Sequence, residues 1–181
     1  MATHDKTAHG GARDRILDAA SRILVRDGGD AVTIAAVASE AGLSKGGLFY
    51  HFASKDALIA GLVDRFVAAF DAVLDVPDSP GAATRAYLDA TAADASPASQ
   101  PVLALLAAAL TSPVALDALR ARYGAWQMRL ENDGIDPAVA TLVRLVADGL
   151  WLSDAFDLAP PSADLRSSVV RRLHALVDAS L

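Results

Sequence analysis

The stretch GLSKGGLFYHF, residues 42–52, decides how the first part of this chain folds. It holds three glycines and three aromatic residues in eleven positions, and two of the glycines, Gly46 and Gly47, are adjacent. Ser44 is a favoured N-cap, so a short helix is predicted to begin at Lys45. Each glycine there costs the helix roughly 1 kcal/mol relative to alanine. A chain that accepts this cost needs open backbone, either for a tight corner of helices or for close approach of another molecule.

The residues before this stretch predict a partner helix. Thr33 can cap a short helix whose inner face is Ile34, Val37 and Ala38. Gly42 ends that helix and can take the positive φ of a tight turn without strain. Two short helices joined by a glycine turn, with a small alanine where they cross, describe a helix-turn-helix. The alternative is a helical corner with no binding role.

A DNA-reading function explains the composition of residues 45–52. The N-terminal part of a recognition helix enters the major groove, where paired glycines would let the duplex come close. Tyr50 and His51 can donate hydrogen bonds to phosphates or base edges. Phe49 and Phe52 are assigned to the small core beneath the helix.

The longer stretch TIAAVASEAGLSKGGLFYHFASKDAL, residues 33–58, resembles the DNA-binding signature of the TetR family of bacterial transcriptional regulators, and the likeness extends over about residues 12–60. Two residues depart from the family pattern: Gly47 stands where Thr or Ser is frequent, and Gly29 where an aromatic residue is common. The resemblance implies that eight residues contact DNA: Thr33, Ser44, Lys45, Gly46, Gly47, Tyr50, His51 and Lys55.

The rest of the chain reads as helix. Four dipeptides, Ser79-Pro80, Ser96-Pro97, Ser112-Pro113 and Asp136-Pro137, each pair a capping residue with proline and predict helix starts near 80, 97–102, 113 and 137. Ser54 can cap a long fourth helix, and Ser162 can cap the last one. The predicted fold is all-α, with nine helices and no strand pattern.

The TetR resemblance also implies a division of the chain. Residues 1–11 are expected to form a flexible tail, residues 12–54 a helix-turn-helix DNA-binding domain, and residues 55–181 a ligand-sensing and dimerisation domain. The stretch VADGLWLSDAF, residues 146–156, is similar to the eighth helix of several drug-sensing members.

Charge is distributed unevenly along the 181 residues. The net charge is −6, from 16 Lys and Arg against 22 Asp and Glu. Residues 1–60 carry seven of each sign, so all the excess acid lies in residues 61–181. Nucleic acid is therefore expected to meet the first part. The longest apolar run, residues 102–110, is too short to span a bilayer, so we expect a cytoplasmic protein with no membrane contact.

The resemblance implies a small-molecule site among the helices of the second domain. Aromatic residues with few polar groups suit a bulky, largely apolar effector, and the scarcity of positive charge near residues 145–160 favours a cationic one. Asp148 is expected to be solvated or at an interface, and so is Asp154. Core packing is the alternative role for each aromatic residue. The candidate lining is Phe66, Phe70, Tyr87, Tyr123, Trp126, Gln127, Trp151 and Asp154.

A palindromic operator needs a homodimer, and the last two helices offer apolar stripes for it. Each stripe can also serve in part as intramolecular core. The candidate interface is Leu142, Leu145, Val146, Gly149, Leu150, Val169, Val170, Leu173, Leu176 and Val177.

The expected function is a ligand-responsive repressor that binds double-stranded DNA as a homodimer. An activator of the same fold is the alternative, and an all-helical carrier or enzyme is a more distant one. The chain has no cysteine, and its four histidines show no metal-ligand or catalytic spacing, so neither cofactor nor enzymatic activity is expected.

Overall fold

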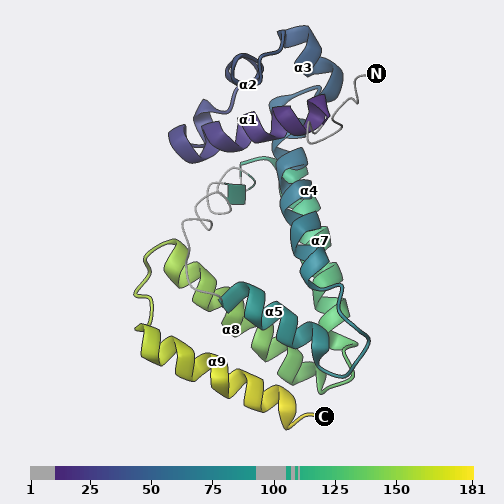
Figure 1. Ribbon diagram of the computed structural model, residues 1–181, viewed down its shortest axis with the longest axis vertical. Helices are drawn as coiled ribbons and strands as arrows, with labels where there is room; N and C mark the ends of the chain where they lie inside the picture. Colours follow the sequence, from purple (N-terminus) through teal and green to yellow (C-terminus); the bar gives the residue numbers. More distant parts are fainter. Residues whose placement is uncertain (1–10, 93–104, 107–108, 110) are drawn as a thin grey trace, which may run out of the picture.

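The computed structural model describes residues 11–92, 105–106, 109 and 111–181. Within them the chain is all-α, and no helix among these residues is long and apolar enough to cross a membrane (Figure 1). The helices are α1 (Ala12–Asp27), α2 (Ile34–Glu40), α3 (Lys45–His51), α4 (Lys55–Val73), α5 (Ala82–Ala92), α7 (Pro113–Glu131), α8 (Pro137–Ala155) and α9 (Ala163–Asp178), with a 3₁₀ turn, η1 (Gly29–Ala31).

Two sequence predictions fall on the remaining residues. The tail expected at residues 1–11 lies outside the described residues except for Gly11. The helix predicted to start within residues 97–102 also begins outside them, although Leu105, Leu106 and Ala109 are helical. The other eight predicted helices are confirmed.

Helices α1, α2 and α3 form a small head at one end of the molecule (Figure 1). Its interior is aliphatic, with Ile16, Leu17, Val37 and Leu48 fully buried. The first turns of α4 complete this core. A Cβ atom added at Gly61 of α4 would lie 2.7 Å from the Phe52 ring, so glycine at that position lets α4 pack closely under the head.

Side-chain caps set most of the helix starts where the sequence predicts them. Thr33 accepts a hydrogen bond from the Ala36 amide at 3.2 Å, and Ser54 accepts one from the Ala57 amide at 3.0 Å. Ser112, Asp136 and Ser162 cap α7, α8 and α9 in the same way. Each cap satisfies an amide that would otherwise lack a partner.

The start of α5 is held differently. The Asp133 carboxylate, from the turn between α7 and α8, accepts hydrogen bonds from the Ala83 amide at 3.1 Å and the Thr84 amide at 2.7 Å. Asp133 is buried, and its carbonyl accepts a further bond from the Gly81 amide at 2.7 Å. Helix α5 therefore begins at Ala82 and is capped by a residue far away in the sequence. The Ser79-Pro80 dipeptide lies just before the helix and does not cap it.

The second domain has two parts in Figure 1. Helices α4 and α7 run side by side away from the head, and α5, α8 and α9 pack together at the far end. Arg166 of α9 is buried at that end, where its guanidinium donates to the Ala92 carbonyl at 2.9 Å and the Leu150 carbonyl at 3.3 Å. One side chain thus connects α9 to both α5 and α8.

Candidate functional site

The turn between α2 and α3 has the geometry expected of a helix-turn-helix. Gly42 has φ +67°, which confirms the prediction of a positive φ there. The Leu43 amide donates to the Ala38 carbonyl at 2.9 Å and closes the turn. Ser44 then caps α3 by accepting from the Gly47 amide at 3.1 Å. The turn fixes the direction in which α3 leaves the head.

Helix α3 has a buried face and an exposed face. Leu48 is fully buried and Phe52 nearly so, as one i, i+4 pair. Tyr50 is 87% exposed. The assignment of Phe49 to the core is wrong, because its side chain is 49% exposed. Phe49 lies one residue beyond Leu48, about 100° further round the helix, and shares the outer face with Gly46.

The two glycines of α3 are not required by packing within the head. A Cβ atom added at Gly46 would meet nothing nearer than the Ser44 Oγ at 4.0 Å, and at Gly47 the same oxygen lies at 3.4 Å. Neither glycine has a positive φ. Because the fold has room for a side chain at both positions, the open backbone favours close approach by another molecule.

Polar groups surround this open backbone. Lys45 is exposed, and the exposed Thr33 and Ser44 keep hydroxyl protons that can donate, since their oxygens act as acceptors in the caps. The Tyr50 and His51 rings meet edge to face at 5.1 Å. Together these groups form a surface of hydrogen-bond donors on the outer side of the head, which we call the α3 surface.

Lys55 has a structural contact that the sequence does not reveal. Its Nζ donates to the Gly29 carbonyl at 2.9 Å and thereby ties the start of α4 to the turn after α1. The ammonium group keeps two further N–H donors, so phosphate contact stays open to it. Sequence reasoning also missed Arg13, whose guanidinium lies 5.3 Å from the centre of the Phe52 ring, at the end of α3. No local spacing links these two residues, which are far apart in the chain.

Four of the candidate ligand residues form a contiguous aromatic cluster between α4, α5 and α7. The Phe70 ring lies 5.2 Å from Tyr87 and 4.7 Å from Trp126, and Tyr123 lies 5.0 Å from Trp126. Tyr87 and Trp126 are buried, and the Trp126 Nε1 donates to Asp71 at 2.6 Å. These two rings serve as core, while the half-buried Phe70 and Tyr123 keep exposed surface.

A partly buried polar network continues from this cluster. Tyr87 donates to Asp148 at 2.6 Å, and Arg144 donates to the same carboxylate at 3.0 Å. Arg144 also donates to Gln127 at 2.5 Å, and Gln127 donates to Thr141 at 2.8 Å. Burial raises the pKa of Asp148 above its ordinary value. The expectation that Asp148 is solvated is therefore wrong, and Gln127 belongs to this internal network.

Burial also affects the two tyrosines beside the network. It raises the pKa of Tyr123 to about 12 and raises that of Tyr87 further, and the nearby Asp148 carboxylate adds to both shifts. Both phenols thus stay protonated at neutral pH. The Tyr123 hydroxyl has no hydrogen bond to the described part of the chain.

The remaining candidates lie apart from the aromatic cluster. Asp154 is mostly buried and forms an ion pair with Arg166 of α9, so the expectation that it is solvated is wrong. The sequence shows little positive charge near residues 145–160. In the structure, however, the Arg144 and Arg166 guanidinium groups pair with the carboxylates of Asp148 and Asp154. Trp151 is half-buried on α8, and Phe66 lines a separate groove with Leu105.

The two stripes proposed for a dimer interface divide by exposure. Leu142, Leu145, Gly149 and Leu176 are exposed. Val146, Val169 and Val170 are half-buried. Leu150, Leu173 and Val177 are buried in this chain, so they belong to the part of each stripe that was expected to serve as intramolecular core.

Comparison with known proteins identifies the family. Residues 16–62 match the pattern described as "Bacterial regulatory proteins, tetR family", and residues 81–178 match "Tetracyclin repressor-like, C-terminal domain". The chain belongs to the TetR family. It is therefore a TetR-family transcriptional regulator with a helix-turn-helix head.

This TetR-family regulator is similar to individual proteins in sequence or in fold. The uncharacterized HTH-type transcriptional regulator YerO of Bacillus subtilis is 36% identical over 55 residues, which are 30% of this chain but only 19% of that protein. Salmonella enterica GusR has a TM-score of 0.71 at 19% identity, covering 96% of this chain and 98% of its own. The multidrug binding protein EbrR, complexed with malachite green, has a TM-score of 0.67 at 26% identity, covering 91% and 98%.

Proposed function

We propose that this TetR-family protein is a repressor that binds a palindromic operator as a homodimer and is released by a small, largely apolar effector. The observation that carries the proposal is the exposed face of α3. There the chain places two glycines that its own packing does not require, flanked by an 87%-exposed tyrosine. Both features suit a recognition helix, whose N-terminal residues come close to base edges in the major groove.

The DNA contacts divide into two kinds. Thr33, Ser44 and Lys55 lie at the starts of α2, α3 and α4, where helix N-termini and hydroxyl or ammonium donors suit phosphate oxygens. Lys45 and Tyr50, on the exposed face of α3, are assigned to the groove, with Gly46, Gly47 and His51 beside them. Phosphate contacts position the head, and the groove contacts supply specificity.

The exposed face of α8 supports the homodimer. Its exposed residues recur at intervals of four and three, which is the spacing of a helix-packing seam. Gly149, near the centre, leaves space within 4 Å for a partner helix. The seam consists of Ala138, Leu142, Leu145, Gly149, Leu152 and Phe156, with Leu176 and the half-buried Val169 on α9.

A charge placed in this seam tests the homodimer. Leu145→Glu should yield monomers in sedimentation velocity, because a carboxylate would be buried against its own copy. Leu158→Glu, in the exposed loop after α8, is the control and should leave the dimer intact. A dimeric Leu145→Glu protein would place the interface elsewhere.

The aromatic cluster supports an apolar, aromatic effector. Phe70 and Tyr123 present exposed ring surface beside the Tyr123 hydroxyl, which can orient a polar group. EbrR is similar at 26% and 25% identity in its complexes with malachite green and ethidium, two aromatic cations. The carboxylates of Asp148 and Asp154 are paired with arginines, so ring faces are the proposed contacts for a cation here.

Release follows if the effector prefers a state in which the two heads are badly spaced for the operator. Helix α4 connects the two parts, because Gly61 packs under the head and Phe70 belongs to the aromatic cluster. An effector that moves the lower half of α4 would therefore move the head.

The decisive experiment is selection of bound duplexes from a random pool, using the full-length protein. We expect an enriched palindrome, and ethidium or malachite green should release it in a titration. A folded protein that enriches no sequence, before and after refolding to remove bound small molecules, would contradict the DNA-binding proposal. A reporter gene under the selected operator then separates repression from activation.

A further inference from the structure

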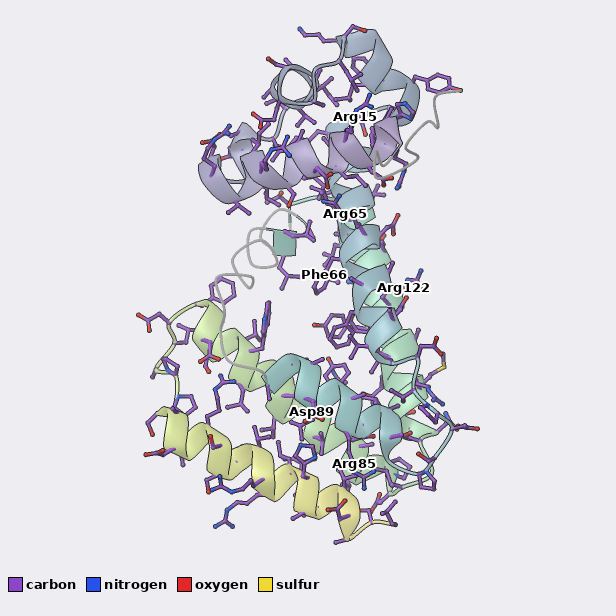
Figure 2. The ribbon with its side chains drawn as sticks, viewed as in Figure 1. Arg15, Arg65, Phe66, Arg85, Asp89 and Arg122 are labelled. Carbon is purple, nitrogen blue, oxygen red and sulfur yellow. The ribbon has the colours of Figure 1, made fainter. Side chains whose placement is uncertain are left out.

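A groove of about 220 Å³ lies where the head meets the second domain, and its described lining includes no member of the aromatic cluster. Its walls come from α1, from the upper part of α4 and from Leu105. In Figure 2, Arg65 lies where α4 passes beneath α1, and Phe66 follows it on the same helix. We call this the junction groove. Its lining is Ser21, Leu24, Leu62, Arg65, Phe66, Ala69 and Leu105.

The junction groove has an apolar floor and a polar edge. Five of its seven described lining residues are aliphatic or aromatic, and Leu24, Leu62 and Leu105 among them are buried. The polar edge consists of Ser21 and Arg65. The Ser21 hydroxyl makes no hydrogen bond within the described part of the chain and is therefore able to donate.

A second, shallower depression of about 580 Å³ adjoins the groove and shares this edge. Ser21 and Arg65 line both hollows. The depression adds Arg22 and Arg26, and Asp18 is the only acid among the described residues of its lining. The carboxylates that pair with Arg22 and Arg26 belong to Asp27 and Glu40, which do not line it. An apolar groove thus opens onto a wall rich in arginine.

Arg65 also holds the head to α4. Its guanidinium donates to Asp18 at 2.5 Å and to the Leu17 carbonyl at 3.2 Å. The Arg65 and Asp18 side chains are 37% and 57% exposed. Exposed ion pairs contribute little net stability, so an incoming carboxylate can replace Asp18 at small cost. Arginine binds a carboxylate with two parallel hydrogen bonds, which favours such an exchange.

We propose that the junction groove binds an amphipathic organic anion. Its ring or chain would lie on Leu24, Leu62 and Phe66, and its carboxylate would take the place of Asp18 at Arg65, with the Ser21 hydroxyl as a second donor. The Arg65 guanidinium would repel a cation, and a neutral molecule could form only the weaker hydrogen bonds of an uncharged acceptor there. This site is separate from the proposed effector site and can be tested without DNA.

The test is calorimetric titration of the full-length protein with 2-naphthoate and with the uncharged 2-naphthamide. We expect 2-naphthoate to bind at least about tenfold more tightly than the amide, which is the usual size of a charge-assisted hydrogen bond. Arg65→Gln should abolish that difference. Asp18→Asn should tighten 2-naphthoate binding, because it removes the competing carboxylate.

A matched pair of variants locates the binding. Ala69 lines the groove and is exposed, so Ala69→Leu should fill the groove without disturbing the fold and should weaken both probes at least tenfold. Ala68→Leu, at the neighbouring exposed position outside the lining, should bind like wild type. Three results would each overturn the proposal: no 2-naphthoate binding, equal binding of acid and amide, or binding that Ala69→Leu leaves unchanged.

Discussion

The interior of the head is made of aliphatic side chains, whereas the interior of the second domain holds arginine–carboxylate pairs. The buried polar residues of the described chain are Thr84, Ser112, Asp133 and Arg166, and all four belong to the second domain. In the head, polar groups gather on the exposed face of α3. An apolar core packs in one way and gives a rigid platform. Polar contacts between helices can exchange partners, so we expect the second domain to be the part that the proposed effector rearranges.

The largest expected effect comes from breaking the buried pair of the second domain. Arg166→Met should lower the free energy of unfolding by about 3–5 kcal/mol, because Asp154 would stay buried without its partner. Urea denaturation at one fixed protein concentration measures this change. The double variant Arg166→Met/Asp154→Leu should recover most of the loss. Equal losses in the single and double variants would mean that the pair is not the cause.

The next effect tests the surface of the head. Tyr50→Ala should weaken operator binding by about 1–3 kcal/mol, or roughly tenfold to a hundredfold, while thermal unfolding stays unchanged because the side chain is 87% exposed. Fluorescence anisotropy with the selected duplex gives the affinity. Met128→Ala, at an exposed position on α7, is the control and should bind like wild type. Wild-type affinity in Tyr50→Ala would remove this residue from the interface.

The same contrast explains what could be predicted from the sequence. Caps and the glycine turn depend on neighbouring residues, so the roles of Thr33, Gly42 and Ser44 follow from the sequence alone. The exposure of Phe49 was predicted wrongly because an aromatic residue beside Leu48 resembles core. Phe49 follows the buried Leu48 directly on a helix, and this position indicates a side chain turned away from the buried face.

Long-range polar contacts could not be predicted. Asp133 caps α5 from about fifty residues away in the chain, and no local pattern marks it. The environment of Asp148 depends in the same way on Tyr87 of a distant helix. The exposure of individual residues in an apolar stripe could not be predicted either. Leu145 and Leu150 belong to the same predicted stripe of one helix, but Leu145 is exposed and Leu150 is buried.

A pH effect of intermediate size should follow from Asp148. Its folded-state pKa is raised above the ordinary value of 3.8, mainly by burial. The folded protein therefore binds this proton more tightly than the unfolded chain does, and stability falls as pH rises from 3.8 through the raised pKa. The slope from one group is at most about 1.4 kcal/mol per pH unit. Asp148→Asn should flatten the curve by that amount, as measured by urea denaturation across the acidic range. An unchanged slope would show that Asp148 titrates normally.

The smallest expected effect separates stability from function at Gly46. Gly46→Ala should stabilise the protein by up to about 1 kcal/mol, because alanine favours helix and the added methyl group fits the head. Operator affinity should nevertheless fall severalfold, since that methyl group occupies the space through which the duplex approaches.

Gly124→Ala is the matched control for this change. Gly124 lies within α7, and a Cβ atom there would also meet nothing within 4 Å. The Gly124→Ala variant should show the same rise in melting temperature as Gly46→Ala, with no change in operator affinity. If Gly46→Ala kept full operator affinity, the space at the paired glycines would not be needed for the approach of DNA. The exposed backbone of α3 would then be no evidence for DNA binding. If both variants stabilise and only Gly46→Ala loses affinity, the cost of glycine in α3 is explained by binding.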